Sequence, residues 1–498
     1  MENRFNLIDE PWIPIAGVGR ASLKQIFANS DYRALGGNPV QKIALMKLLL
    51  AIAQAACTPA DEYEWKALDA QGLAQQCLAY LEKWHECFYL YGEKPFLQIP
   101  AIASAAVQPF GAVLPQIATG NTTVLTQGQV DRALSDADKA LLVLGLMGFA
   151  LGGKKTDNSV TLSAGYVGKR NDKGKPSTAK PGPAVAHMGL LHNLLAGESL
   201  WQSLWLNLLT QEQVTDSQKF AQGVGTPPWE QMPEGEDCAV ARALKDSLMG
   251  RLLPLCRFCL LTENGLHYSE GIAHNNYKEG RCDPSVAVNW SGKEPKALWC
   301  NPEKRPWREL TSLLSFIAQQ QNAGFDCLQL HAGIQRTCET VACFALWSGG
   351  LRVSSNAGEQ YASGSDDFVE SELWLHSAAL GDLWFDQLKL EMSALDEQAK
   401  NLYGRVMGYF KEQLVDGAEL AAQGTQMFWQ LCERDFQHLL DSCEQDEVSQ
   451  ESRKKLRRRF AAYVNQAYDQ YCPKDTARQL DAWAKCRPNL SKYLAQEA

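Results

Sequence analysis

Lysine and arginine side chains cluster in one glycine-containing stretch of an otherwise acidic protein. Residues 150–182, the basic loop, contain seven of these cations and two aspartates, while the 498-residue chain carries a formal net charge of −9. Lys169 and Arg170 could neutralise phosphates, and Gly165 and Gly168 would let the backbone approach a nucleic-acid groove closely. The stretch therefore predicts contact with a polyanion. A solvated surface loop that keeps the protein soluble is the alternative interpretation.

A second basic run occupies residues 453–459, where six of seven positions are Lys or Arg. On the helix expected there, these charges spread over more than one face and repel one another unless an anion or acidic neighbours offset them. Arg457 and Arg458 are the candidates for contact with a polyanion. A solvated helix face is the alternative, although two basic elements far apart in sequence fit a track for a polyanion better than one.

Motifs that carry enzymatic chemistry are missing from the sequence. We find no GxxxxGK[ST] phosphate loop, no GxSxG nucleophile elbow and no HExxH metal motif, and the eight histidines are spread singly along the chain. The sequence thus predicts no catalytic residues and no cofactor. The competing class is a metal-dependent nuclease or phosphoesterase that would use Cys256, Cys259 and scattered carboxylates.

The fifteen cysteines are scattered through the chain, which favours reduced and mostly buried thiols over a disulfide framework. Cys256 and Cys259 form a CxxC pair that could bind zinc together with Cys282 and Cys300. The pair lies in a strand-like run, where residues three apart point to opposite faces, and no second CxxC follows. We therefore expect no metal site.

The first elements expected along the chain, which would position these residues, are helices. Apolar residues recur every three or four positions in 38–56, 61–91, 137–153 and 187–209. Asp61 and Glu64 are predicted to cap the second of these helices at its N-terminus. The third would lead directly into the basic loop.

The pattern changes in the middle of the chain and again near residue 366. Residues 251–272 read as two strands around the turn Glu263-Asn264-Gly265, since Asn-Gly favours positive φ angles. Beyond 366 the sequence is almost entirely compatible with helices joined by short connections. The predicted fold class is α+β, with a mixed, mostly helical domain over 1–365 and an antiparallel four-helix bundle over 366–498.

Composition bounds the location of the protein. With 45% hydrophobic residues the chain can bury a large core. No apolar run reaches the roughly 18–20 residues needed to span a bilayer, and the first residues lack the apolar centre of a signal peptide. We expect a cytoplasmic protein without a membrane partner.

Several short motifs, in order along nearly the whole chain, resemble those of the CasA family, the large subunits of the type I-E CRISPR interference complex Cascade. They are FNLIDEPWIPI, CFYLYGEKPFLQIP, ATGNTTVLTQ, LWSGGLRVSSN and ARQLDAWAKCRPNLSKYL. The third departs from the family at Leu125, Thr126 and Gln127, where Phe, Asp and His are frequent. Each motif is weakly specific, and their order and spacing carry the resemblance.

The resemblance implies a noncatalytic reader of double-stranded DNA. Such a subunit recognises the protospacer-adjacent motif from the minor-groove side, helps to open the duplex and recruits a helicase–nuclease. Its other partners would be the remaining Cascade subunits and the CRISPR RNA. The protein would recognise a short motif, and the RNA would recognise the rest of the target by base pairing. Because the minor groove distinguishes A·T from T·A poorly, we expect the protein to accept several motifs.

The family uses a glycine loop, a lysine finger and a glutamine-bearing wedge. The resemblance places the glycine loop on SAGYVGK, at Gly165, Tyr166, Gly168 and Lys169, and the finger on Lys278, shortly before Asp283-Pro284. The wedge falls on GEQYASGSDD, whose length departs from the family pattern; its candidates are Asn356, Gln360 and Tyr361. A scaffold that binds only protein neighbours is a third interpretation.

Overall fold

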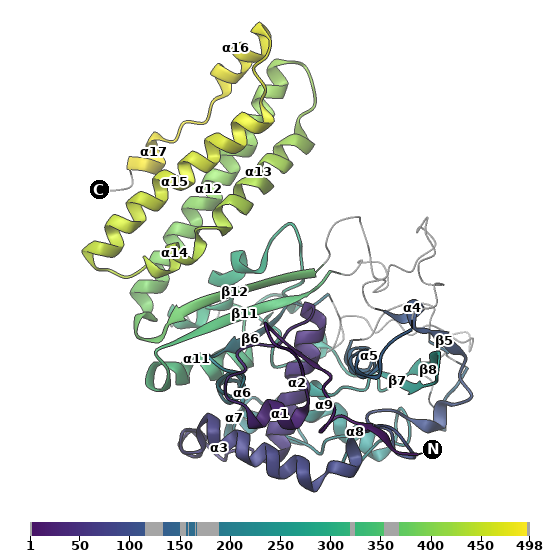
Figure 1. The fold of residues 1–498 in the computed structure, drawn as a ribbon. Helices are drawn as coiled ribbons and strands as arrows, with labels where there is room; N and C mark the ends of the chain where they lie inside the picture. The colour runs from purple at the N-terminus through teal and green to yellow at the C-terminus, as the bar shows by residue number, and fades with distance from the viewer. Residues whose placement is uncertain are drawn as a thin grey trace. The chain divides into compact units, whose positions relative to one another are not determined.

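The computed structural model describes residues 2–114, 133–149, 156–157, 159–164, 166, 189–318, 324–352 and 368–495. The chain divides into two compact units (Figure 1). The first comprises Met1–Trp307 and Asn322–Glu372, and the second Arg308–Gln321 and Leu373–Ala498. Both units are thus built from two segments of the chain, an arrangement that a single boundary near residue 365 does not describe.

The first unit mixes helices with short strands. Its helices are α1 (Leu23–Ala28), α2 (Pro39–Ala56), α3 (Glu62–Lys83), α4 (Phe110–Val113), α5 (Asp136–Gly148), α6 (Leu200–Asn207), α7 (Gln211–Asp216), α8 (Ala239–Lys245), α9 (Met249–Leu252) and α11 (Leu328–Thr340). The predicted helix at 38–56 is confirmed as α2. The predicted helix at 61–91 is confirmed as α3 only as far as Lys83, because a 3-10 helix (His85–Phe88) and strand β4 (Tyr89–Tyr91) follow it. The Asp61 carboxylate accepts a hydrogen bond from the Glu64 backbone N–H at 2.9 Å, which confirms the predicted cap.

The strands of the described residues form five small sheets. They are β1 (Arg4–Asn6), β2 (Ile13–Ile15), β3 (Gly19–Ala21), β4 (Tyr89–Tyr91), β5 (Val107–Pro109), β6 (His192–Ala196), β7 (Arg257–Leu261), β8 (Gly265–Glu270), β9 (Val288–Asn289), β10 (Lys296–Ala297), β11 (Cys343–Leu351) and β12 (Phe368–His376). The three-stranded sheets have the orders β12-β11-β6 and β5-β8-β7, and the pairs are β1-β4, β2-β3 and β9-β10. The fold is therefore mixed α+β, as predicted.

Helix α2 runs through the interior of the first unit and contacts α3, α5, α6, α9 and β11. Its 18 residues have a mean hydropathy of 1.3, and 78% of them are buried. By length and composition it is the one helix among the described residues that could cross a membrane, which corrects the prediction that no apolar run is long enough. Its burial instead identifies it as a core helix of this unit.

Strand β6 corrects the prediction of continuous helix over 187–209. Residues His192–Ala196 pair antiparallel with β11, with Leu195 opposite Leu346. Helix α6 begins only at Leu200, where the Ser199 side chain accepts from the Gln202 backbone N–H. A short apolar run such as HNLLA fits a buried strand and a helix equally well, and the partner strand, about 150 residues away in sequence, decides between them.

Strand β12 corrects the prediction that helices begin near residue 366. Residues Phe368–His376 lie beside β11 in the sheet, and α12 begins at Asp382. Val369, Leu373 and Leu375 are buried while Glu372 and His376 are exposed. This alternation with period two is typical of a strand, and the sequence carries that signal.

The predicted hairpin at 251–272 is confirmed as β7 and β8, which pair antiparallel with Leu261 opposite Leu266. The reason for glycine in its turn is different from the predicted one, because Gly265 does not have a positive φ. Instead, a Cβ at Gly265 would lie 2.4 Å from the carbonyl oxygen of Gln108 in the neighbouring strand β5. Glycine thus permits the close approach of β5.

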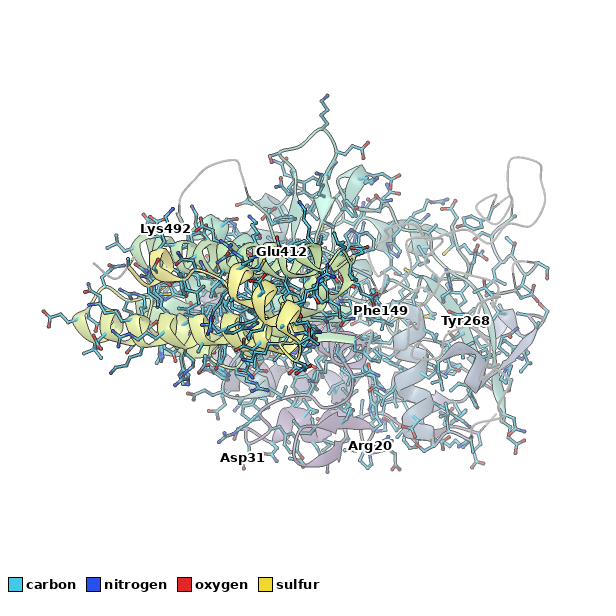
Figure 2. All side chains as sticks on the ribbon, turned by 90° about the horizontal axis from the view of Figure 1, so that it is seen from above. Arg20, Asp31, Phe149, Tyr268, Glu412 and Lys492 are labelled. Carbon is cyan, nitrogen blue, oxygen red and sulfur yellow. The ribbon has the colours of Figure 1, made fainter. Side chains whose placement is uncertain are left out.

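The second unit contains α10 (Leu310–Leu313), α12 (Asp382–Glu412), α13 (Ala418–Glu433), α14 (Phe436–Asp441), α15 (Glu447–Tyr471), α16 (Ala477–Cys486) and α17 (Ser491–Ala495). Helix α12 contacts α13, α15 and α16, and α15 also contacts α13, α14 and α17. The long helices run side by side, and Figure 2 shows their side chains, with Glu412 at the end of α12 and Lys492 in α17 labelled.

Candidate nucleic-acid interface

The structure describes four of the predicted DNA-binding residues. Tyr166 and Lys278 belong to the first unit, and Arg457 and Arg458 to the second. The others lie outside the described residues: Gly165, Gly168, Lys169, Arg170, Asn356, Gln360 and Tyr361.

The described start of the basic loop is attached to the β5-β8-β7 sheet through Asp157. The Asp157 backbone N–H donates to the carbonyl oxygen of Tyr268 in β8 at 2.8 Å, and Tyr268 is labelled in Figure 2. The Asp157 carboxylate accepts from the Ala106 backbone N–H at 2.9 Å, directly before β5. The carboxylate also accepts from the backbone N–H and the hydroxyl of Ser159.

A few residues later, the loop is bonded to the connection that precedes α8. The Glu236 carboxylate accepts from the Leu162 backbone N–H at 3.1 Å and from the Ser163 backbone N–H at 2.8 Å. The Asp237 backbone N–H donates to the Ser163 hydroxyl at 2.8 Å. The Glu236 side chain has no solvent exposure, so a buried carboxylate holds the segment from which the glycine loop continues.

Tyr166 follows this anchored segment, and its backbone N–H donates to the Ser163 carbonyl at 3.2 Å. Burial, together with the negative charges of Glu270 and Glu236, raises the pKa of the Tyr166 phenol to about 12. The phenol is therefore neutral at physiological pH and retains its proton as a hydrogen-bond donor.

Lys278 lies on a short 3-10 helix, Tyr277–Glu279, whose base is well ordered by hydrogen bonds. The Asn276 side chain accepts from the Lys278 backbone N–H at 2.8 Å, and the Glu279 carboxylate accepts from the Asn276 backbone N–H at 2.9 Å. Tyr277 is buried in an apolar cluster that includes Val288 of β9 and Ala297 of β10. The backbone of the predicted finger is thus fixed to a packed base.

The Lys278 ammonium itself lies at the surface. Its side chain is 50% exposed, and Nζ is 3.5 Å from a carboxylate oxygen of Glu294, whose side chain is 77% exposed. An ion pair this exposed contributes only about 0–1 kcal/mol because water and salt screen it. Lys278 can therefore exchange Glu294 for a phosphate or a base edge at little cost.

The first unit also contains a buried polar network that the sequence analysis did not predict. The Asp283 carboxylate pairs with the Lys47 ammonium of α2 and accepts from the Ser285 hydroxyl at 2.7 Å. The Lys47 and Asp283 side chains are 5% and 1% exposed. Ser285 also lies 2.9 Å from Nδ1 of His192. Lys47, flanked on both sides by apolar residues of α2, was the available signal, since a buried lysine requires an anionic partner.

The cysteines predicted as zinc candidates are buried. Cys256 precedes β7 and Cys259 lies within it. Burial raises the pKa of the Cys256 thiol to about 11 and that of Cys259 to about 12, so both are protonated at neutral pH. Within the described ranges, no group of three or more His, Cys, Asp or Glu side chains is arranged to hold a metal ion. All fifteen cysteines lie among the described residues, none of them forms a disulfide, and most are buried.

Three cations of the basic run on α15 are bonded inside its own unit. Arg457 donates to the Glu391 carboxylate of α12 at 2.6 and 3.1 Å, and Glu391 is 1% exposed. Arg453 is buried and donates to the Glu444 carbonyl at 2.7 Å. Arg459 pairs with Asp435. We therefore expect Arg457 to act mainly as the partner of Glu391, while Arg458 is exposed and stays a candidate for DNA contact.

Comparison with known proteins places this arrangement in a family. A family profile described as CRISPR-associated protein Cse1 matches residues 6–467. The chain belongs to the Cse1 family. The CRISPR-associated protein CasA/Cse1 of Thermus thermophilus is 29% identical over 339 residues. That alignment spans 62% of this chain and 60% of the length of the relative.

Solved structures of Cse1 proteins share the fold. The crystal structure of Thermus thermophilus CasA has a TM-score of 0.74 at 20% identity and covers 99% of this chain and 100% of that one. Thermobifida fusca Cse1 has a TM-score of 0.75 at 19% identity, with 99% and 97% covered. A chain of a CRISPR RNA-guided surveillance complex has a TM-score of 0.67 at 15% identity, with 98% and 99% covered.

Proposed function

We propose that this chain is the noncatalytic large subunit of a type I-E CRISPR RNA-guided surveillance complex. The observation that supports this most strongly is the match of the Cse1 profile to residues 6–467. The likeness to a chain solved as part of an RNA-guided surveillance complex supports it further. The proposed partners are the other Cascade subunits, the CRISPR RNA, the double-stranded DNA target and a helicase–nuclease, all in the cytoplasm.

The proposed role is recognition of the protospacer-adjacent motif and help in opening the duplex. The mixed first unit would recognise DNA, and the long helices of the second unit would form an antiparallel four-helix bundle. Gly165, Tyr166 and Gly168 would approach the minor groove, with Lys169 and Arg170 on phosphates. Lys278 would act as the finger, the wedge candidates Asn356, Gln360 and Tyr361 would separate the strands, and Arg458 would add a phosphate contact.

Two features of the geometry support this role: the backbone at the start of the glycine loop and at Lys278 is fixed, and the Lys278 side chain can change its partner. Glu236 holds the start of the glycine loop, and the Asn276 cap holds the backbone of Lys278. The Lys278 ammonium is only weakly held by Glu294. Such pre-organisation reduces the ordering cost of binding. We do not favour the metal-dependent nuclease, because a chain with the same fold was solved as part of a CRISPR RNA-guided surveillance complex.

The proposal predicts that the chain makes DNA binding by the complex depend on the flanking trinucleotide. The complex would be assembled with and without this chain, and its affinity measured for duplexes with the same guide match but different flanks. We expect the chain to introduce a difference between flanks. Equal gains for every flank would identify a nonspecific grip or a scaffold and contradict the proposal.

A narrower prediction concerns the Lys278 ammonium. If it reaches a base edge, Lys278→Ala should weaken binding of motif-bearing DNA by about 1–3 kcal/mol and relax discrimination between flanks. If it contacts only phosphate, the loss should be uniform across sequences. Glu294→Gln is the matched control, because it removes the competing carboxylate and should leave affinity equal or slightly higher. An unchanged affinity of Lys278→Ala would contradict the finger assignment.

A further inference from the structure

A buried carboxylate holds the described start of the basic loop. Glu236 accepts hydrogen bonds from two consecutive backbone N–H groups, those of Leu162 and Ser163, and is itself fully buried. We infer that Glu236 is a positioning residue for motif recognition, which sets the place and direction in which the chain enters the glycine loop. This inference rests on the proposed function.

The chemistry of the contact suits a carboxylate in particular. Glutamate offers two acceptor oxygens and no donor, so both can face backbone N–H groups, and the negative charge strengthens the bonds. One oxygen lies 2.8 Å from the Ser163 nitrogen, and both lie 3.1–3.2 Å from the Leu162 nitrogen. The bonds use the backbone of 162–163, so Glu236 is the side chain through which they can be tested.

The residues on either side of Glu236 complete the contact. A Cβ at Gly235 would lie 2.6 Å from the Ser163 hydroxyl and 3.1 Å from its backbone nitrogen, so glycine is needed for this approach. On the other side, the Asp237 N–H donates to the Ser163 hydroxyl. The Asp237 carboxylate in turn lies 3.3 Å from the Lys245 ammonium of α8. Three consecutive residues thus attach Ser163 to a helix-supported segment.

A second attachment point makes the position well defined. Asp157 is bonded to Tyr268 of β8 and to Ala106 before β5. Between these two attachments lie only a few residues, so both ends of the 157–163 segment are fixed before any ligand binds. Contacts between the backbone and a DNA groove require one backbone geometry. Long lysine and arginine side chains, by contrast, can reach phosphates from many backbone geometries. Loss of the Glu236 contact should therefore reduce discrimination between flanks more than general affinity.

The test compares variants of the full chain in the assembled complex, using duplexes with a motif flank and with a scrambled flank. Glu236→Ala should lower the affinity ratio between flanks by about tenfold, with the affinity for the scrambled flank within about twofold of wild type. Glu236→Gln keeps one acceptor oxygen, so its affinity ratio between flanks should lie between those of Glu236→Ala and the wild type. Glu234→Ala, at an exposed position two residues earlier, is the matched control and should behave as wild type.

Two further measurements separate the possible failures. Hydrogen exchange at the Leu162 and Ser163 amides should accelerate in both Glu236 variants, and Gly168→Asp tests the glycine loop directly. If exchange accelerates but the affinity ratio stays at its wild-type value, the inference is wrong. If Glu236→Ala does not fold, the same comparison is made with Glu236→Gln. If Gly168→Asp loses discrimination and the Glu236 variants do not, only the inference fails. If the wild-type complex shows no flank dependence, the proposed function fails and the inference with it.

Discussion

Lys47→Ala should lower the free energy of unfolding by about 3–5 kcal/mol, because it leaves the Asp283 carboxylate buried without its cation. The two side chains are 5% and 1% exposed, so water cannot replace the missing charge. Lys47 also donates to the Arg251 carbonyl at 3.1 Å, and this acceptor would lose its partner as well. Urea denaturation followed by tryptophan fluorescence would measure the change.

Lys42→Ala provides the matched control for this prediction. Lys42 lies on the same helix and pairs with Glu370, but these side chains are 25% and 32% exposed. A pair that water can reach contributes far less, and we expect a loss of about 0–1 kcal/mol. Equal losses for the two variants would show that burial of the Lys47 pair has no special weight.

The pH dependence of the Lys47 variant gives an independent check. Burial acts to raise the pKa of Asp283, but the charge of Lys47 and the Ser285 hydroxyl bring it below the ordinary value of 3.8. In the wild type, the stabilisation from the depressed pKa is present above 3.8 and is lost as the pH falls below it. The deficit of Lys47→Ala should therefore shrink on acidification, because a protonated Asp283 no longer requires a cation.

Arg457→Ala should also lower the stability of the second unit by about 3–5 kcal/mol, since it leaves the buried Glu391 carboxylate without its arginine. The Arg457 and Glu391 side chains are 13% and 1% exposed, and two hydrogen bonds join them. Thermal or urea unfolding of the full chain would detect the loss. Arg458→Ala is the control, because that neighbouring side chain is exposed and its removal should change stability by about 0.5 kcal/mol or less.

A double variant distinguishes an ion-pair role from a role in DNA binding. Arg457→Met combined with Glu391→Leu removes both charges and fills the space, so it should recover most of the stability lost in Arg457→Ala. DNA affinity of the complex should then be close to wild type. A double variant that is stable but binds DNA weakly would return Arg457 to the DNA-binding surface.

Local patterns in the sequence were sufficient for the elements whose causes are local. The apolar periodicity of α2 and α3, the Asp61 cap and the β7-β8 hairpin all depend on residues within one or two turns or a tight connection. The ordered series of motifs was sufficient for the family, which the profile match over residues 6–467 confirms. Order and spacing survive in a sequence even when each motif is weak.

The tertiary structure alone decided the features that join distant segments. The strand at His192–Ala196 exists because β11 supplies its hydrogen bonds, and an isolated apolar run does not contain that information. Lys47 and Asp283 are 236 positions apart in the sequence, and Glu391 and Arg457 are 66 apart. Glu236 and Leu162, which are joined by a hydrogen bond, are separated by 74 positions. Charges in the basic run looked available because sequence shows their number but not their partners. Burial, which determines whether a charge must be paired internally, is a property of the packed chain.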